Sequence, residues 1–280
     1  MLKTRVITAL ALMAILLPSI FWLPQAHWAL LIAAFIGVAG WEWGALLGWQ
    51  KTGRLLLGVS TAAICAALSF SYPAAIGSNI GAAEFLPAQP WVFLFYGLST
   101  AFWLLLIPFW LQGKWALRGV SGLLVGAVVL LPTWLAMVQL RAIGPGVLLA
   151  VFAVVWMADI AAYFAGRRFG KRKLAPSISP GKTWEGAYGA TFGVLIYGLL
   201  IGHFFLADRV ALPLWVVVLL LVTAVSIIGD LFESLLKRKA GIKDSSNVLP
   251  GHGGVLDRID SLTSTLPVVA AIWLLFVYGA

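Results

Sequence analysis

The stretch that decides the fold runs from Pro213 to Leu236 and reads PLWVVVLLLVTAVSIIGDLFESLL. It is apolar up to Ile228 apart from Thr223 and Ser226, and as a helix it is long enough to cross about 30 Å of hydrocarbon. Carboxylates follow only near its end. The pattern predicts a transmembrane helix that carries acidic groups to one membrane surface.

Comparable apolar runs recur along the whole chain. Of its 280 residues, 62% are hydrophobic and 10% are charged, which excludes a water-soluble domain because too little polar surface remains to cover the core. Barrel strands would instead give short alternating segments. We expect an all-α, polytopic membrane helix bundle. Its nine predicted spans are 6–24, 28–48, 55–76, 91–111, 120–140, 146–166, 184–206, 213–236 and 261–279.

The basic residues orient these spans. With the N-terminus in the cytoplasm, all but two of the 19 Lys and Arg residues fall on the cytoplasmic side, the exceptions being Arg141 and Arg209. The C-terminus is then expected outside. The first apolar run is predicted to be an uncleaved span rather than a signal peptide. Cys65, the single cysteine, lies in an apolar run and is predicted to be a buried thiol.

The acidic residues divide the chain unequally. Before residue 150 the only ones are Glu42 and Glu84, and Glu84 falls in a predicted outside loop with no evident chemistry. We therefore expect residues 1–145 to form a lipid-facing scaffold. Residues 146–280 are expected to form the catalytic region, with cytoplasmic loops at 167–183 and 237–260.

The first polar constellation covers residues 158–186. Asp159 should lie about two turns inside the sixth span, where an ionised group is costly and usually functional. Tyr163, one turn further on the same face, could share a cavity with it. The basic run at 167–173 either fixes orientation as a stop-transfer cluster or attracts an anionic headgroup or nucleotide.

The end of this constellation resembles a phosphate-binding loop only superficially. Pro176 stands where the first glycine of such a loop would fall, and no strand is expected before it. Ser179, Lys182 and Thr183 still precede a helix whose first N–H groups could receive phosphate oxygens. An ordinary helix cap is the alternative.

The second constellation closes the eighth span. Asp230, Glu233, Ser234 and Lys237 line one stripe of a helix. Glu233 and Lys237 could form a routine surface pair. Asp230 is too deep to be left solvated and needs a metal, a basic partner or a proton.

The third constellation is DSSNVLPGHGGVLDRID, residues 244–260. Asp257 and Asp260 open the last span and face one way on a helix. Gly253 and Gly254 would let the backbone approach a ligand closely. His252 could bind a metal, donate to phosphate or cap the loop.

Asp230 and Asp257 end consecutive spans at one face and could meet across the bundle. Hard oxygen ligands without cysteine suit Mg²⁺, which also takes substrate phosphates. With lysines and arginines close by, this is the equipment for phosphoryl or nucleotidyl transfer.

The second and third constellations together resemble the signature of phosphatidate cytidylyltransferases, also called CDP-diacylglycerol synthases. The chain reads S-x-x-K-R-x4-K-D from Ser234 and P-x-H-G-G-x-x-D-R-x-D up to Asp260. Segments 162–167 and 178–186 are also similar to that family, although Gly181 replaces its usual second basic residue. The resemblance is sharp over residues 158–260 and elsewhere extends only to span number and hydropathy.

This resemblance implies an enzyme of the bacterial cytoplasmic (inner) membrane, with its active site on the cytoplasmic side, that converts CTP and phosphatidic acid to CDP-diacylglycerol and pyrophosphate. It implies Mg²⁺ on Asp230 and Asp257, with K⁺ beside it. The catalytic residues would be Asp230, Asp257, Lys237, Arg238, Lys243 and Arg258. Substrate or phosphate contacts would come from Ser179, Lys182, Thr183, Ser234, His252, Gly253 and Gly254. Supporting roles would fall to Asp159, Tyr163, Glu185, Glu233, Asp244 and Asp260.

Two other functions use similar features. A transporter could use Asp159 and Asp230 as ion sites, but its carboxylates would not all gather at one face. A CTP-dependent lipid kinase would use the same donor, metal and membrane edge. Membrane lipids are expected partners, nucleic acid is not, and a homodimer is compatible with the family.

Overall fold

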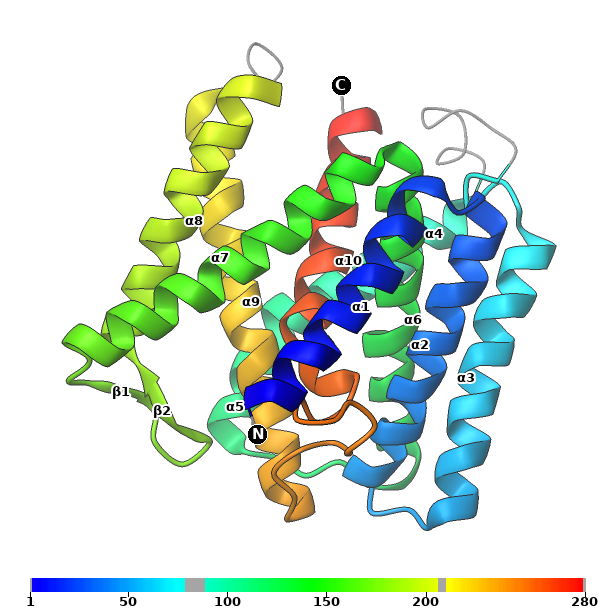
Figure 1. Ribbon diagram of the computed structural model, residues 1–280, viewed down its shortest axis with the longest axis horizontal. Coiled ribbons are helices and arrows are strands. Elements are labelled where there is room, and N and C mark those ends of the chain that lie inside the picture. Colours follow the sequence, from blue (N-terminus) through cyan, green and yellow to red (C-terminus); the bar gives the residue numbers. More distant parts are fainter. Residues whose placement is uncertain (1, 79–88, 206–209, 279–280) are drawn as a thin grey trace.

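The computed structural model describes residues 2–78, 89–205 and 210–278. Within them, nine helical segments are long and apolar enough to cross a membrane, which confirms the predicted all-α bundle. The start of α1 and the end of α10 lie at opposite ends of the bundle (Figure 1). The elements are α1 (Leu2–Trp22), α2 (Gln25–Leu46), α3 (Lys51–Ser71), α4 (Pro90–Ala101), the π-helical turn η1 (Phe102–Leu106), α5 (Ile107–Gly113), α6 (Gly119–Ile143), α7 (Pro145–Phe169), β1 (Lys173–Ala175), β2 (Ser179–Thr183), α8 (Trp184–Phe205), α9 (Leu212–Ala240) and α10 (Leu256–Tyr278).

Local sequence explains where the long helices begin and end. Pro90, Pro145 and Pro213 lie in the first turns of α4, α7 and α9, where the missing proline N–H costs nothing. Gly241 ends α9 in the left-handed conformation, with φ of 71°, and its N–H donates to Arg238. The chain therefore leaves α9 sharply and enters the polar loop 241–255.

Small residues let neighbouring helices pack closely. A side chain on Gly189 would collide with Ala165, and one on Gly193 would meet Ala161, so α7 and α8 touch along this face. Gly37 and Gly58 do the same for α2 and α3. Helix α10 packs against α9, α6 and α4 and so lies inside the bundle (Figure 1).

The cytoplasmic loop predicted at 167–183 differs from expectation. It contains the antiparallel hairpin β1–β2, in which Lys173 faces Thr183 and Ala175 faces Ser179. The expectation that no strand precedes Pro176 was therefore wrong, because β1 ends just before it. A phosphate-binding loop stays excluded since Pro176 still replaces the required glycine.

The last span also begins earlier than hydropathy indicated. Helix α10 starts at Leu256 rather than at residue 261, and it takes in Asp257, Arg258 and Asp260. Hydropathy placed these polar residues outside the membrane span, whereas the helix forms there because side chains cap its first N–H groups, as described below. Helix α9 likewise continues to Ala240.

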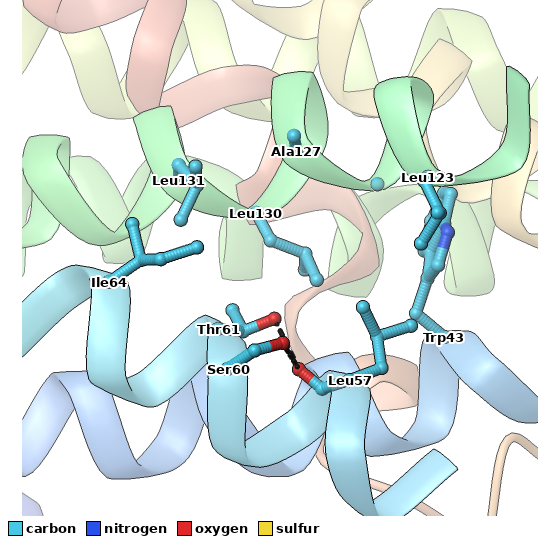
Figure 2. Close-up of a pocket in the computed structure, with 10 residues that line it drawn as sticks. Trp43, Leu57, Ser60, Thr61, Ile64, Leu123, Ala127, Leu130 and Leu131 are labelled. Carbon is cyan, nitrogen blue, oxygen red and sulfur yellow. Dashed lines mark hydrogen bonds between the residues drawn. The ribbon is translucent and has the colours of Figure 1, made fainter. Parts of the chain in front are cut away.

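An apolar cavity of about 190 Å³ lies between α3 and α6, next to Trp43 of α2 (Figure 2). The hydroxyls of Ser60 and Thr61 on its wall both donate to the carbonyl of Leu57. No charged side chain lines this cavity, so it does not suit a nucleotide. Cys65 is buried, as predicted. Glu84, Asp208 and Arg209 lie outside the described residues.

Candidate active site

The hairpin, the 241–255 loop and the start of α10 lie at one end of the bundle (Figure 1). Polar side chains from α7, β2, α9 and α10 interact there. At the centre of one group, Asp230 forms an ion pair with Lys182 of β2, and the hydroxyl of Ser234 donates to Asp230 at 3.3 Å. Asp159 and Asp260 are close enough to Asp230 to repel it electrostatically, and Lys182 offsets that repulsion. Asp159 of α7, Asp230 of α9 and Asp260 of α10 thus lie near one another, and in the described chain Lys182 forms an ion pair with Asp230 among them. We call the three carboxylates with Lys182 the Asp230 cluster.

A second group is more deeply buried. The Lys237 Nζ lies 2.5 Å from Glu233 Oε2 and 2.7 Å from Asp257 Oδ1. The exposed fractions of these side chains are 14% for Lys237, 5% for Glu233 and 3% for Asp257. The interpretation of Glu233 and Lys237 as a surface pair is therefore wrong. Sequence spacing gave the pair, but tertiary packing around the end of α9 buries it.

Asp257 also organises the loop before it. Its Oδ2 accepts hydrogen bonds from the Ser245 N–H at 2.9 Å, the Ser245 hydroxyl at 2.9 Å and the Gly254 N–H at 2.8 Å. With Lys237 on its other oxygen, Asp257 has donors on both sides. From the first turn of α10 it therefore holds the preceding loop closed, at Ser245 and at Gly254.

Asp230 and Asp257 lie on neighbouring helices at the same end of the bundle, but they pair with different lysines. Within the described part of the chain, no group of three or more His, Cys, Asp or Glu side chains is arranged to hold a metal ion. Their joint role as Mg²⁺ ligands stays a prediction.

Glu42 of α2 reaches the same loop from the first half of the chain, and the sequence analysis missed it. Its side chain is fully buried. It accepts hydrogen bonds from the Val255 N–H at 2.9 Å, the Leu256 N–H at 2.6 Å and the Ser246 hydroxyl at 2.5 Å. The available signal was its position inside an apolar span, where a lone carboxylate is expensive and usually functional.

The hairpin positions two further predicted residues. The buried Thr183 hydroxyl accepts a hydrogen bond from the Gly186 N–H at 3.1 Å, so Thr183 caps α8. Glu185 accepts the backbone N–H groups of Lys171 at 3.0 Å and Arg172 at 3.2 Å. Glu185, in the first turn of α8, therefore ties the connection between α7 and β1 to the start of α8. Its supporting role in the reaction stays a prediction. A phosphate contact by Thr183 stays a prediction.

Three predicted phosphate ligands, Arg238, Lys243 and Arg258, have exposed side chains. The Arg238 Nε donates to the carbonyl of Ile178 at 3.4 Å, which connects α9 to the hairpin. Tyr163 is exposed, and its hydroxyl accepts a hydrogen bond from Arg167 at 2.9 Å. The structure thus pairs Tyr163 with Arg167, while Asp159 belongs to the Asp230 cluster.

The remaining predicted residues lie in β2 and in the 241–255 loop. Ser179 is half-buried, Asp244 is exposed, and His252 has a buried Nδ1 without a hydrogen-bond partner in the described chain. Gly253 has φ of 84°, which favours glycine. At Gly254 a side chain would collide with Ser245 and with the Glu42 carboxylate, so packing alone already requires glycine there.

Comparison with known proteins gives this geometry a context. A protein from Pseudomonas aeruginosa named phosphatidate cytidylyltransferase is 43% identical over 281 residues, covering 97% of both chains. One of the same name from Haemophilus influenzae is 34% identical and covers 95% of this chain and 96% of its own. One from Brucella suis is 53% identical over 133 residues, or 46% of this chain and 45% of its own. A sequence model described as the cytidylyltransferase family matches residues 3–276, so the chain belongs to that family.

Proposed function

We propose that this chain is an integral membrane nucleotidyltransferase that transfers CMP from CTP to phosphatidic acid, giving CDP-diacylglycerol and pyrophosphate. The observation that carries the proposal is similarity over nearly the whole chain to relatives named phosphatidate cytidylyltransferase. The collection of the signature residues of α9, the loop and α10 at one end of the bundle supports it.

The carboxylates of the Asp230 cluster are the kind of ligand that Mg²⁺ prefers, although no three of them are arranged to hold an ion in the described chain. Asp159, Asp230 and Asp260 offer hard oxygen ligands that repel one another, so a divalent cation would relieve their repulsion. Asp230 and Asp257 remain the ligands we propose, completed by substrate phosphates. To bind the ion, Asp257 would give up one of the hydrogen-bond donors that it now has, from Lys237, Ser245 or Gly254. When bound, the ion would withdraw charge from the triphosphate. K⁺ as a second cation is a further expectation from the family resemblance.

The protein's own residues would have separate roles in the transfer step. A phosphate oxygen of the lipid attacks the α-phosphorus of CTP, a new P–O bond forms, and the bond to the bridging α–β oxygen breaks as pyrophosphate leaves. The cations Arg238, Lys243 and Arg258, whose side chains are exposed, would neutralise charge on that leaving group. Lys237 is enclosed by carboxylates, so its first task is to hold Asp257 in place.

Other predicted contacts fit around this reaction. Ser179, Lys182 and Thr183 at the hairpin would face the nucleotide or the lipid headgroup, and Lys182 would leave Asp230 when a cation binds. The site would lie at the cytoplasmic face of a bacterial inner membrane, since the basic residues concentrate at that end. Phosphatidic acid would then enter sideways from the inner leaflet while CTP arrives from the cytoplasm. A homodimer is compatible with this arrangement.

The test uses purified protein with phosphatidic acid micelles and CTP labelled at either the α- or the γ-phosphorus. Cytidylyl transfer puts the α-label on the lipid and releases pyrophosphate. A γ-label on the lipid would identify a CTP-dependent lipid kinase, and absence of label on the lipid with either substrate would contradict both activities. A parallel reaction with a chelator, with and without added Mg²⁺, tests the metal requirement.

A further inference from the structure

We infer that Glu42 is a positioning residue for this reaction: its buried carboxylate holds the 245–256 segment and the first turn of α10 in the arrangement that brings Asp257 to Lys237. The inference rests on the proposed function. It assigns a role to a residue that lies more than 180 positions before the signature and outside the region expected to be catalytic.

The contacts of Glu42 show that it serves the loop. All three of its hydrogen-bond donors, the Ser246 hydroxyl and the N–H groups of Val255 and Leu256, belong to the segment that ends at Asp257. No Lys or Arg in the described chain forms an ion pair with Glu42. A fully buried carboxylate without an ion-pair partner is stabilised by its hydrogen-bond donors. The Glu42 carboxylate therefore depends on the 245–256 segment, and the position of that segment depends on the Glu42 carboxylate.

Glu42 and Asp257 share the start of α10. Three successive N–H groups, those of Gly254, Val255 and Leu256, point to carboxylates, the first to Asp257 and the next two to Glu42. The N–H groups of Val255 and Leu256 are among those that a helix leaves unpaired at its start, and the N–H group of Gly254 comes just before them. Because both carboxylates bind adjacent amides, displacing Glu42 would also displace the amide that holds Asp257.

The packing around Gly254 confirms how closely these groups fit. A side chain at Gly254 would overlap both the Glu42 carboxylate and the Ser245 hydroxyl. A second contact from the first half of the chain lies nearby, where the Thr8 hydroxyl of α1 donates to the Pro250 carbonyl at 2.9 Å. The first half of the chain thus fixes the loop at two points, and Glu42 is the buried one.

The experiment compares the full-length protein with Glu42→Gln, Glu42→Asp and Ser246→Ala. Glutamine keeps the shape of the side chain but replaces one carboxylate oxygen by an amide NH₂, which then faces at least one of the three donors and cannot accept from it. Aspartate keeps the negative charge but, being one methylene shorter, moves the carboxylate away from the loop N–H groups. The matched control is Gln139→Leu. Gln139 is also buried and forms hydrogen bonds, with the Tyr96 hydroxyl at 2.7 Å and the Ala75 carbonyl at 2.7 Å, but in the described chain it forms none with the 241–255 loop.

Two readouts separate positioning from general stability: kcat and KM for CTP, and amide hydrogen exchange of peptides covering 245–257. Glu42→Gln should lower kcat about a hundredfold, as misplacement of about 1 Å can, with KM for CTP changed by less than about threefold because ground-state binding is not the interaction removed. Exchange in the 245–257 peptides should become faster. Glu42→Asp should lose less and Ser246→Ala least, while Gln139→Leu should leave both readouts unchanged.

Retention of wild-type kcat by Glu42→Gln, or an equal loss in Gln139→Leu, would overturn the inference. If the wild-type protein showed no cytidylyl transfer, the proposed function would fail, and unchanged exchange in Glu42→Gln would then separately overturn the role in holding the loop. If Glu42→Gln could not be isolated folded, Ser246→Ala would decide, since unchanged kcat and exchange there would also count against Glu42.

Discussion

Replacing Lys237 with methionine tests the buried group at the end of α9. Lys237 lies between Glu233 and Asp257, at 2.5 Å and 2.7 Å, and all three side chains are largely buried. Methionine keeps most of the length of the side chain, being one atom shorter, and removes its charge. The two carboxylates then lose the cation that they share.

Loss of the Lys237 charge affects Glu233 more than it affects Asp257. Asp257 retains three donors, from Ser245 and Gly254, on its other oxygen. Lys237 is the one ion-pair partner that the described chain gives Glu233, so Glu233 is left buried and unpaired. Removing one partner of a buried pair costs about 3–5 kcal/mol, against about 0–1 kcal/mol for a surface pair. At this chain length, the loss corresponds to a fall in melting temperature of roughly 10 °C.

The assay is thermal unfolding of the purified protein in detergent, combined with turnover. Lys239→Met is the matched control, because Lys239 is exposed on the same last turn of α9 and its loss should change the melting temperature little. The double variant Lys237→Met with Glu233→Met should recover most of the stability, since an apolar pair of similar size replaces the ion pair. It should not recover turnover. A Lys237→Met protein as stable as wild type, or a double variant no more stable than the single one, would refute the reasoning.

Three further predictions concern the site. Asp230→Asn should lower turnover by at least about a hundredfold while the protein still inserts in the membrane, because a ligand charge for the metal is lost; substantial activity of the purified variant would contradict the metal assignment. Removing divalent ions with a chelator should stop turnover and added Mg²⁺ should restore it, and activity that persists in excess chelator would exclude a metal requirement. Gly254→Ala should destabilise the protein by about 1–3 kcal/mol through overlap with Ser245 and Glu42, whereas Gly146→Ala, where a side chain meets open space, should have little effect; equal melting temperatures for the two variants would count against the tight fit.

The sequence predicted the membrane architecture well because hydrocarbon imposes one dominant constraint. A span must be apolar over about twenty residues, and composition alone reveals that. Hydropathy set the start of the last span too late, at residue 261, because Asp257 and Arg258 break the apolar signal. The spacing of Asp257 and Asp260 already indicates a helix there. The sequence reasoning also missed the hairpin at Lys173–Ala175 and Ser179–Thr183, which is too short to give a strand pattern.

The candidate site was predictable in its members but only partly in its pairings. Helical spacing placed Asp230, Glu233 and Lys237 on one stripe, and the structure confirms that Glu233 and Lys237 meet. Which lysine would pair with Asp230 depended on the path of the hairpin, which brings Lys182 from a separate segment. Glu42 could not be connected to the loop by local spacing, since that contact joins residues 213 and 214 positions apart.

The buried contact between Glu42 and the start of α10 also limits how this chain can be recombined with its relatives. A chimera that joins the first half of a relative to the second half of this chain keeps every signature residue of this chain, yet its loop still needs a carboxylate from the incoming α2. Such hybrids should work only when the incoming helix supplies an acid at the matching depth. For the same reason, two halves expressed as separate chains would have to find each other before the loop could adopt its shape.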